Sequence, residues 1–148
     1  MFLKPNLEIV LNHLDKLDPD TKPKWGTLSS QGMVEHLTDV LKIASGENKQ
    51  KLLIPEEKIQ SMQRFLDSDK EMMQNISVPF APAERVLRND NLSDAIDEFV
   101  ETWIAFEEHF DSAQVTELHP FYGELDFNGW QKLNSKHLTH HFKQFDLM

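Results

Sequence analysis

Apolar side chains recur at intervals of three and four residues along most of this 148-residue chain. That interval is the period of an α-helix that turns one face to a core, so it predicts amphipathic helices. No segment alternates convincingly between apolar and polar residues, as a half-buried strand does. The pattern therefore predicts an all-α fold, and the length favours a single domain over residues 1–148.

Start and stop signals bound the expected helices. We predict them over about 6–17, 30–45, 55–66 and 93–110, and from 128 into the last twenty residues. The expected N-caps are Ser29 or Ser30, Ser93 and Asn128, with Gln131 in a capping box with Asn128. The irregular stretch 67–91 is long for a connection and predicts a crossover or a lid over a pocket. The four longer helices describe a four-helix bundle with one long irregular crossover.

Charge and composition limit the expected partners. The chain has 25 acidic against 15 basic residues, so it is a poor match for nucleic acid or an anionic membrane. It has no cysteine, which removes thiolate ligands and thiol nucleophiles of its own. We find no apolar run of about 18 residues and no basic, apolar leader. We therefore expect a cytoplasmic protein that does not enter a membrane.

Three histidines stand close together near the C-terminus, and two of them are four residues apart. His137 and His141 share a helical face with Trp130, Leu133 and Gln144, at steps of 3, 4, 4 and 3. A random chain of this composition would contain such a histidine pair about one time in three, so the spacing is a weak signal by itself. The buried face strengthens it, because imidazoles in a core stripe need polar partners or a metal ion.

A third ligand comes from the second helix. His36 lies on the core face that also carries Met33 and Val40, near the middle of that helix. If this helix packs beside the last one, His36 meets the His137/His141 pair. Three histidines with an open fourth position are typical of a catalytic zinc-like site. The alternative is that each histidine is a core residue hydrogen-bonded to a backbone carbonyl or a hydroxyl group.

Candidates for other roles are less distinct, and we assign no catalytic acid or base. Glu35, Glu107, Glu108 and His109 could act as a base but equally fit solvated helix surfaces, and Asp39 could hydrogen-bond a ligand imidazole. We expect structural or solvent roles for His13 and His119, with His119 bordering a pocket mouth. Tyr122 beside Gly123 predicts a turn, or alternatively a phenol that reaches the site. Trp25, Trp103 and Trp130 are expected in the core or an interface.

Two stretches also carry a family resemblance. WGTLSSQGMVEHLTDVL runs from Trp25 to Leu41, and the stretch from His119 to Phe145 ends in HLTHHFKQF. Both resemble the DinB/YfiT-like superfamily of metalloenzymes, in a branch described as a domain of unknown function. The resemblance implies an up-down-down-up bundle whose metal is bound by His36, His137 and His141. It also implies thiol-dependent chemistry: transfer of bacillithiol, mycothiol or glutathione, isomerisation of a thiol adduct, or an amidase reaction on such conjugates.

Two classes of function follow from these observations. The first is a metal-dependent enzyme, a thiol-dependent S-transferase or a hydrolase of a small molecule, using zinc, nickel or iron. Its metal would lower the pKa of a bound water or hold a low-molecular-weight thiol as the thiolate. The second is a non-enzymatic bundle that binds metal or dimerises. We also expect a homodimer.

Overall fold

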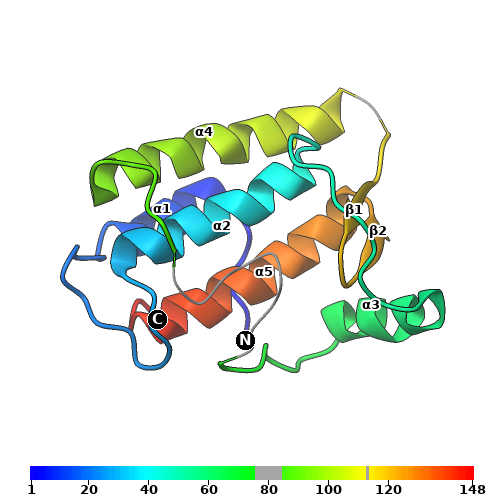
Figure 1. Cartoon of the computed structure of the whole chain (residues 1–148), viewed down its shortest axis with the longest axis horizontal. Helices are drawn as coiled ribbons and strands as arrows, with labels where there is room; N and C mark the ends of the chain where they lie inside the picture. Colours follow the sequence, from blue (N-terminus) through cyan, green and yellow to red (C-terminus); the bar gives the residue numbers. More distant parts are fainter. Residues whose placement is uncertain (76–84, 113) are drawn as a thin grey trace.

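The computed structural model describes residues 1–75, 85–112 and 114–148 (Figure 1). Its elements, in chain order, are α1 (Leu7–Leu14), α2 (Ser30–Ala44), the 3₁₀ turn η1 (Glu56–Lys58), α3 (Ile59–Asp67), α4 (Leu92–Asp111), β1 (Glu117–His119), β2 (Gly123–Leu125) and α5 (Phe127–Gln144). The described residues are thus mostly helical.

Helix α2 lies between α4 and α5, and both pack against it (Figure 1). Helix α1 contacts α4, and its His13 ring stacks on Phe142 of α5 with ring centroids 5.6 Å apart. Helix α3 and the β1–β2 hairpin lie together at one end of the molecule, against the first part of α5 (Figure 1). The side chains between α1, α2, α4 and α5 form the core, which includes Trp103 and Trp130 as predicted.

Side-chain N-caps explain where four of the helices begin, because each accepts a hydrogen bond from an otherwise unpaired backbone N–H. Asn6 caps α1, and Ser29, one of the two serines expected there, caps α2. The other two predicted caps are wrong. Asn91 rather than Ser93 caps α4, and Asp126 rather than Asn128 caps α5. In both cases the actual cap lies two residues earlier, so each predicted residue belongs to the first turn instead.

The change of cap also removes the predicted capping box. Gln131 lies within α5 and donates to the backbone carbonyl of Pro5 at 3.2 Å, so it joins the N-terminal segment to the last helix. At the other end of α2 the stop signal is confirmed. Gly46 follows the C-cap with φ +79°, and a Cβ there would come 2.9 Å from Glu117 Oε2. The position therefore favours glycine for both conformation and space.

The sequence missed the β-hairpin. β1 and β2 pair antiparallel, with Glu117 opposite Leu125 and His119 opposite Gly123. Three residues per strand are too few for a visible period of two, and the hairpin gains its support from packing on α2 and α5. Tyr122 does lie in the connecting turn, as predicted, and Gly123 adopts φ +73° against Ile59.

The long connection is described only in part. Residues 68–75 and 85–91 contain no helix or strand, as expected, while 76–84 lie outside the described residues. The predicted crossover or lid therefore falls partly outside them. Among the residues that the structure describes, every helix is too short or too polar to span a bilayer.

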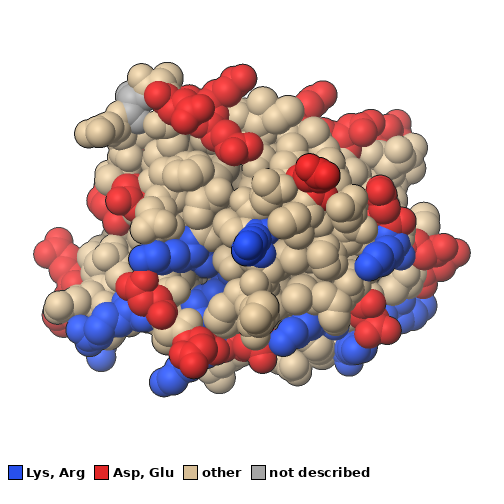
Figure 2. Space-filling view, turned by 180° about the vertical axis from the view of Figure 1, so that it is seen from behind, with Lys and Arg blue, Asp and Glu red and all other residues tan. Residues whose placement is uncertain are grey.

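The predicted fold class is confirmed only at the level of a mostly helical chain. The strictly all-α prediction is wrong, because the described residues form five α-helices and a two-stranded sheet. The four-helix bundle stays a prediction. Figure 2 shows acidic side chains gathered along the edge formed by α4, and Lys and Arg side chains interspersed with acids over the rest of that face.

The caps provide a test of the α4 boundary. Asn91→Ala is expected to lower the free energy of unfolding by about 1 kcal/mol, because it removes the acceptor for the Asp94 N–H. Ser93→Ala is the matched control, since Ser93 lies on the exposed first turn, and its effect should stay within about 0.5 kcal/mol. Urea unfolding of both variants checks this. A larger loss for Ser93→Ala than for Asn91→Ala would contradict the boundary.

Candidate metal centre

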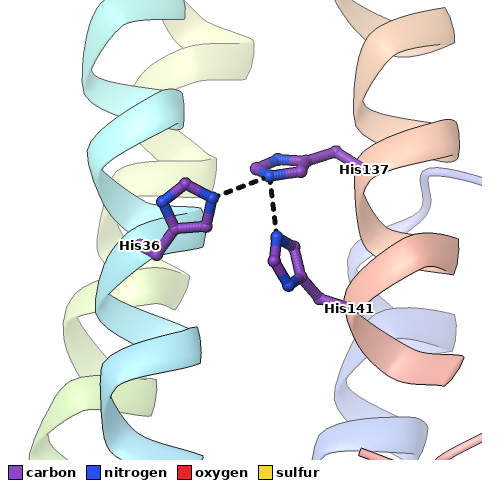
Figure 3. A group of neighbouring side chains, drawn as sticks. All are labelled: His36, His137 and His141. Atoms are coloured by element: carbon purple, nitrogen blue, oxygen red, sulfur yellow. Dashed lines mark hydrogen bonds between the residues drawn. The ribbon is translucent and has the colours of Figure 1, made fainter. Parts of the chain in front are cut away.

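Three imidazoles from two helices point toward one another between α2 and α5 (Figure 3). His36 comes from the middle of α2, and His137 and His141 come from successive turns of α5. The predicted packing of these two helices therefore brings all three predicted residues together. Each histidine follows the 3.6-residue period of the large apolar residues on its own helix, and it therefore lies on the inward face of that helix.

Their Nε2 atoms converge. His137 Nε2 lies 2.9 Å from His36 Nε2 and 3.1 Å from His141 Nε2. One nitrogen from each ring can be chosen so that all three lie within 4.8 Å of one another. Zn–N bonds of about 2.0–2.1 Å in a tetrahedron place ligand nitrogens about 3.3 Å apart. Two of the three spacings are therefore close to those between ligands of one ion.

Gln144 fixes the tautomer of one ring. The Gln144 amide nitrogen donates to the Trp25 carbonyl at 2.9 Å, which leaves its Oε1 facing His141 Nδ1 at 2.7 Å. Since an amide oxygen only accepts, His141 Nδ1 must carry the hydrogen. A neutral His141 therefore presents a free lone pair on Nε2, the atom that faces the other two rings.

Burial keeps the three rings neutral. His141 is buried, with 7 % of its surface exposed, while His36 and His137 are partly buried. Burial lowers the pKa of His36 to about 4, with a further contribution from the Arg85 charge. Burial also lowers the pKa values of His137 and His141 well below the usual value, and the neighbouring histidines add to the effect. Neutral imidazole is the form that binds metal.

The acidic residues next to His36 have other partners. The buried Glu35 carboxylate accepts hydrogen bonds from the backbone N–H groups of Arg88 and Asn89 at 2.9 and 3.1 Å. Burial raises its pKa, but these bonds and those from the Gln31 and Asn89 side chains outweigh burial and lower it overall. The carboxylate therefore anchors the 88–89 backbone to α2, which makes a role as a base a poor fit.

Asp39 also differs from the expectation. Its carboxylate forms ion pairs with Arg85 and Arg88 rather than hydrogen-bonding a ligand imidazole. Neither Arg85 nor the role of Gln144 was expected from the sequence. Gln144 could have been found from its place three residues after His141 on the same stripe, whereas Arg85 lies in an irregular segment without a periodic signal.

The remaining candidates lie elsewhere. Glu107 and Glu108 are exposed near the end of α4, and His109 bonds Glu117 of the hairpin at 2.7 Å. His13 has the structural role expected, since its Nδ1 donates to the Ile9 carbonyl at 2.8 Å. His119 has the structural role that was one of its two expected roles, but it is buried in the hairpin rather than placed at a pocket mouth.

His119 lies in β1 with 5 % of its surface exposed, because the hairpin folds it against the rings of Tyr122 and Trp130. Its Nδ1 accepts the Phe121 N–H at 3.0 Å, and burial lowers its pKa to about 3. Trp25 is partly buried and its ring packs edge-on against His140, with centroids 5.4 Å apart.

Comparison with known families settles the relationship of the chain. A family model described as a protein of unknown function, DUF1569, matches residues 4–148. The chain belongs to the DUF1569 family. No curated protein and no solved structure matches it.

Membership of DUF1569 corrects the family assignment made from the sequence. The predicted DinB/YfiT-like relationship is wrong: no DinB-like family model matches, and the DUF1569 match includes both stretches that suggested it. The two stretches do not discriminate between the families, because a mid-helix histidine facing an i, i+4 pair is a geometry that more than one helical family can share. The thiol-dependent chemistry that the resemblance implied loses that support.

The buried histidines of this DUF1569 protein predict a pH dependence of stability without metal. His36 and His119 have folded pKa values of about 4 and 3, below the ordinary 6.5, so the unfolded chain binds more protons between these limits. The free energy of unfolding should therefore fall as the pH drops below 6.5, by at most about 1.4 kcal/mol per pH unit for each histidine.

Urea unfolding in the presence of a chelator between pH 7.5 and 6 measures this slope above the range in which most carboxylates titrate. His119→Gln should reduce the slope, because it removes one group that is protonated only on unfolding. An unchanged slope in that variant would show that His119 is not held neutral.

Proposed function

We propose that this protein binds one divalent transition-metal ion through His36, His137 and His141 and is a metal-dependent enzyme acting on a small molecule. The observation that carries the proposal is the convergence of three Nε2 atoms within the range of a single ion. Neutral imidazole suits zinc, nickel and iron, and three nitrogen ligands leave a coordination position for a substrate or water. A bundle of α1, α2, α4 and α5 around this site is the finer description of the fold that we propose.

The hydrogen-bond requirements of the three rings support a metal over a simple core network. His141 Nε2 carries a lone pair and can only accept a hydrogen bond. His137 Nε2 must therefore carry a hydrogen if it is to donate to His141. That hydrogen cannot also satisfy His36 Nε2 with good geometry, although it lies 2.9 Å away. If His137 accepts from His36 instead, two lone pairs face each other. A cation that accepts three lone pairs removes this conflict.

Access from solvent is part of the proposal. His36 and His137 each keep some exposed surface, whereas His141 is buried. When bound, the metal would act as a Lewis acid that lowers the pKa of a coordinated water or thiol. The chain has no cysteine, so any thiol would come from a cosubstrate. A hydrolase and a small-molecule transferase are thus the two reaction classes to compare.

Metal content tests the centre directly. Tag-free wild-type protein is expected to hold close to one equivalent of metal by elemental mass spectrometry, after reconstitution with zinc, nickel, manganese or ferrous iron. His137→Ala should lose it while circular dichroism shows the same helical content, because His137 Nε2 is the central atom of the three. Tag-free protein is needed because nickel resin can load a site that normally takes another metal.

His140→Ala is the matched control. His140 lies on the same helix next to His141, with ring centroids 4.9 Å apart, but does not belong to the converging group. Its metal content should equal that of the wild type. Equal metal in wild type and His137→Ala, or no metal in the wild type under any of these conditions, would leave the histidines as core hydrogen-bonding residues.

Gln144 provides a second test that leaves the ligands in place. Gln144→Leu removes the acceptor that holds the His141 tautomer, so the metal dissociation constant should rise about 10–100-fold. Gln131→Leu is the control, because Gln131 lies on the same helix but bonds Pro5 and Asn134. Competition with a chelating dye measures both. Equal constants for the two variants would exclude an orienting role for Gln144.

A further inference from the structure

Arg85 lies along the face of α2 that carries His36. Its Cδ is 3.5 Å from the position that a Cβ at Gly32 would occupy, and its guanidinium group pairs with Asp39. Gly32, His36 and Asp39 are four and three residues apart, so they share one helical face. A side chain that contacts both Gly32 and Asp39 must therefore pass next to His36, which lies between them.

The electrostatics of His36 agree with this placement. After burial, the Arg85 charge is the next largest cause of the low pKa of His36, and the Asp39 charge acts in the opposite direction. The placement itself rests on the contacts of Arg85 with Gly32 and Asp39 on either side of His36. The Arg85 side chain is also well buried, with 11 % of its surface exposed.

The hydrogen bonding of Arg85 is incomplete. Its terminal nitrogen donates to Asp39, but its Nε is buried and has no hydrogen-bond partner among the described residues. Asp39 accepts from the terminal nitrogen and not from Nε, and its other oxygen pairs with Arg88 at 2.9 Å. A buried donor without an acceptor is unfavourable, and a guanidinium group offers two parallel N–H groups that match a carboxylate or phosphate.

A purely structural role for Arg85 explains less. The segment that follows it is already held to α2 by the Glu35 carboxylate, which accepts from the Arg88 and Asn89 backbone. Arg88 adds a second attachment through Asp39 and a third through Glu98 of α4. A further attachment by a buried arginine with a free donor adds little, whereas an anion would complete its hydrogen bonding.

We infer that Arg85 binds a carboxylate or phosphate group of the substrate, next to the metal at His36. The inference rests on the proposed metal centre and specifies its substrate class as a small anionic molecule. The metal would coordinate one group of the substrate, and the Nε side of Arg85 would bind its anionic group. The two positively charged groups together would favour an anion over a neutral molecule of the same shape.

Cobalt(II)-loaded protein tests the inference, because the absorption of a cobalt site changes when an anion binds at or beside it. Acetate and inorganic phosphate are titrated separately into wild type, Arg85→Gln and Arg88→Gln. At least one of the two probes is expected to bind wild type, with a dissociation constant about tenfold or more higher in Arg85→Gln. The better probe shows whether the site prefers carboxylate or phosphate.

Arg88→Gln is the matched control, since it removes the same charge from the same Asp39 and should weaken binding less than threefold. If Arg85→Gln does not fold, Arg85→Lys keeps the charge beside Asp39 but loses Nε, and it should weaken binding in the same direction. Equal affinities in wild type and the Arg85 variants, or no response to either probe, would overturn the inference.

Cobalt content measured on the same samples separates the two proposals. Wild-type protein that binds no cobalt contradicts the metal centre itself. Protein that binds one equivalent in every variant but shows no Arg85-dependent affinity contradicts only the assignment of Arg85.

Discussion

The contact between α2 and α5 sets the central physical problem of this molecule, because it forces three imidazole nitrogens together in a mostly apolar interior. Two of the N···N distances are 2.9 and 3.1 Å, yet neutral rings cannot satisfy both contacts with hydrogen atoms. Purely apolar residues at these positions would pack without that conflict. This conflict supports the metal ion that we propose between the rings.

The surroundings of the triad are arranged to hold it. Gln144 connects His141 to the carbonyl of Trp25. The end of α5 and the segment before α2 therefore fix the orientation of the His141 ring together. Glu35 holds the 88–89 backbone against α2, and this places Arg85 and Arg88 around Asp39. Each of these contacts joins residues far apart in the sequence, so ring orientation and nearby charge depend on the whole fold.

A second buried carboxylate anchors the other end of α2. Glu117 of β1 is 4 % exposed and pairs with Lys49 at 2.5 Å and with His109 at 2.7 Å. Burial raises its pKa, but Lys49 and His109 more than offset this and lower it overall. The hairpin is thereby fastened to the ends of α2 and α4. It thus stabilises the C-terminal ends of both helices rather than the surroundings of His36, His137 and His141.

The sequence by itself determined the helical stripes and the inward positions of His36, His137 and His141, because these follow from the local 3.6-residue period. It narrowed the cap of α2 to Ser29 or Ser30. It misplaced the caps of α4 and α5, where two neighbouring polar residues could each serve and only the path of the preceding chain selects one. It missed a hairpin too short to show a period. Only the tertiary structure decided the partners of Asp39, the tautomer of His141 and the place of Arg85, since each depends on contacts between segments from 46 to 119 residues apart. Such contacts leave no local pattern in the chain.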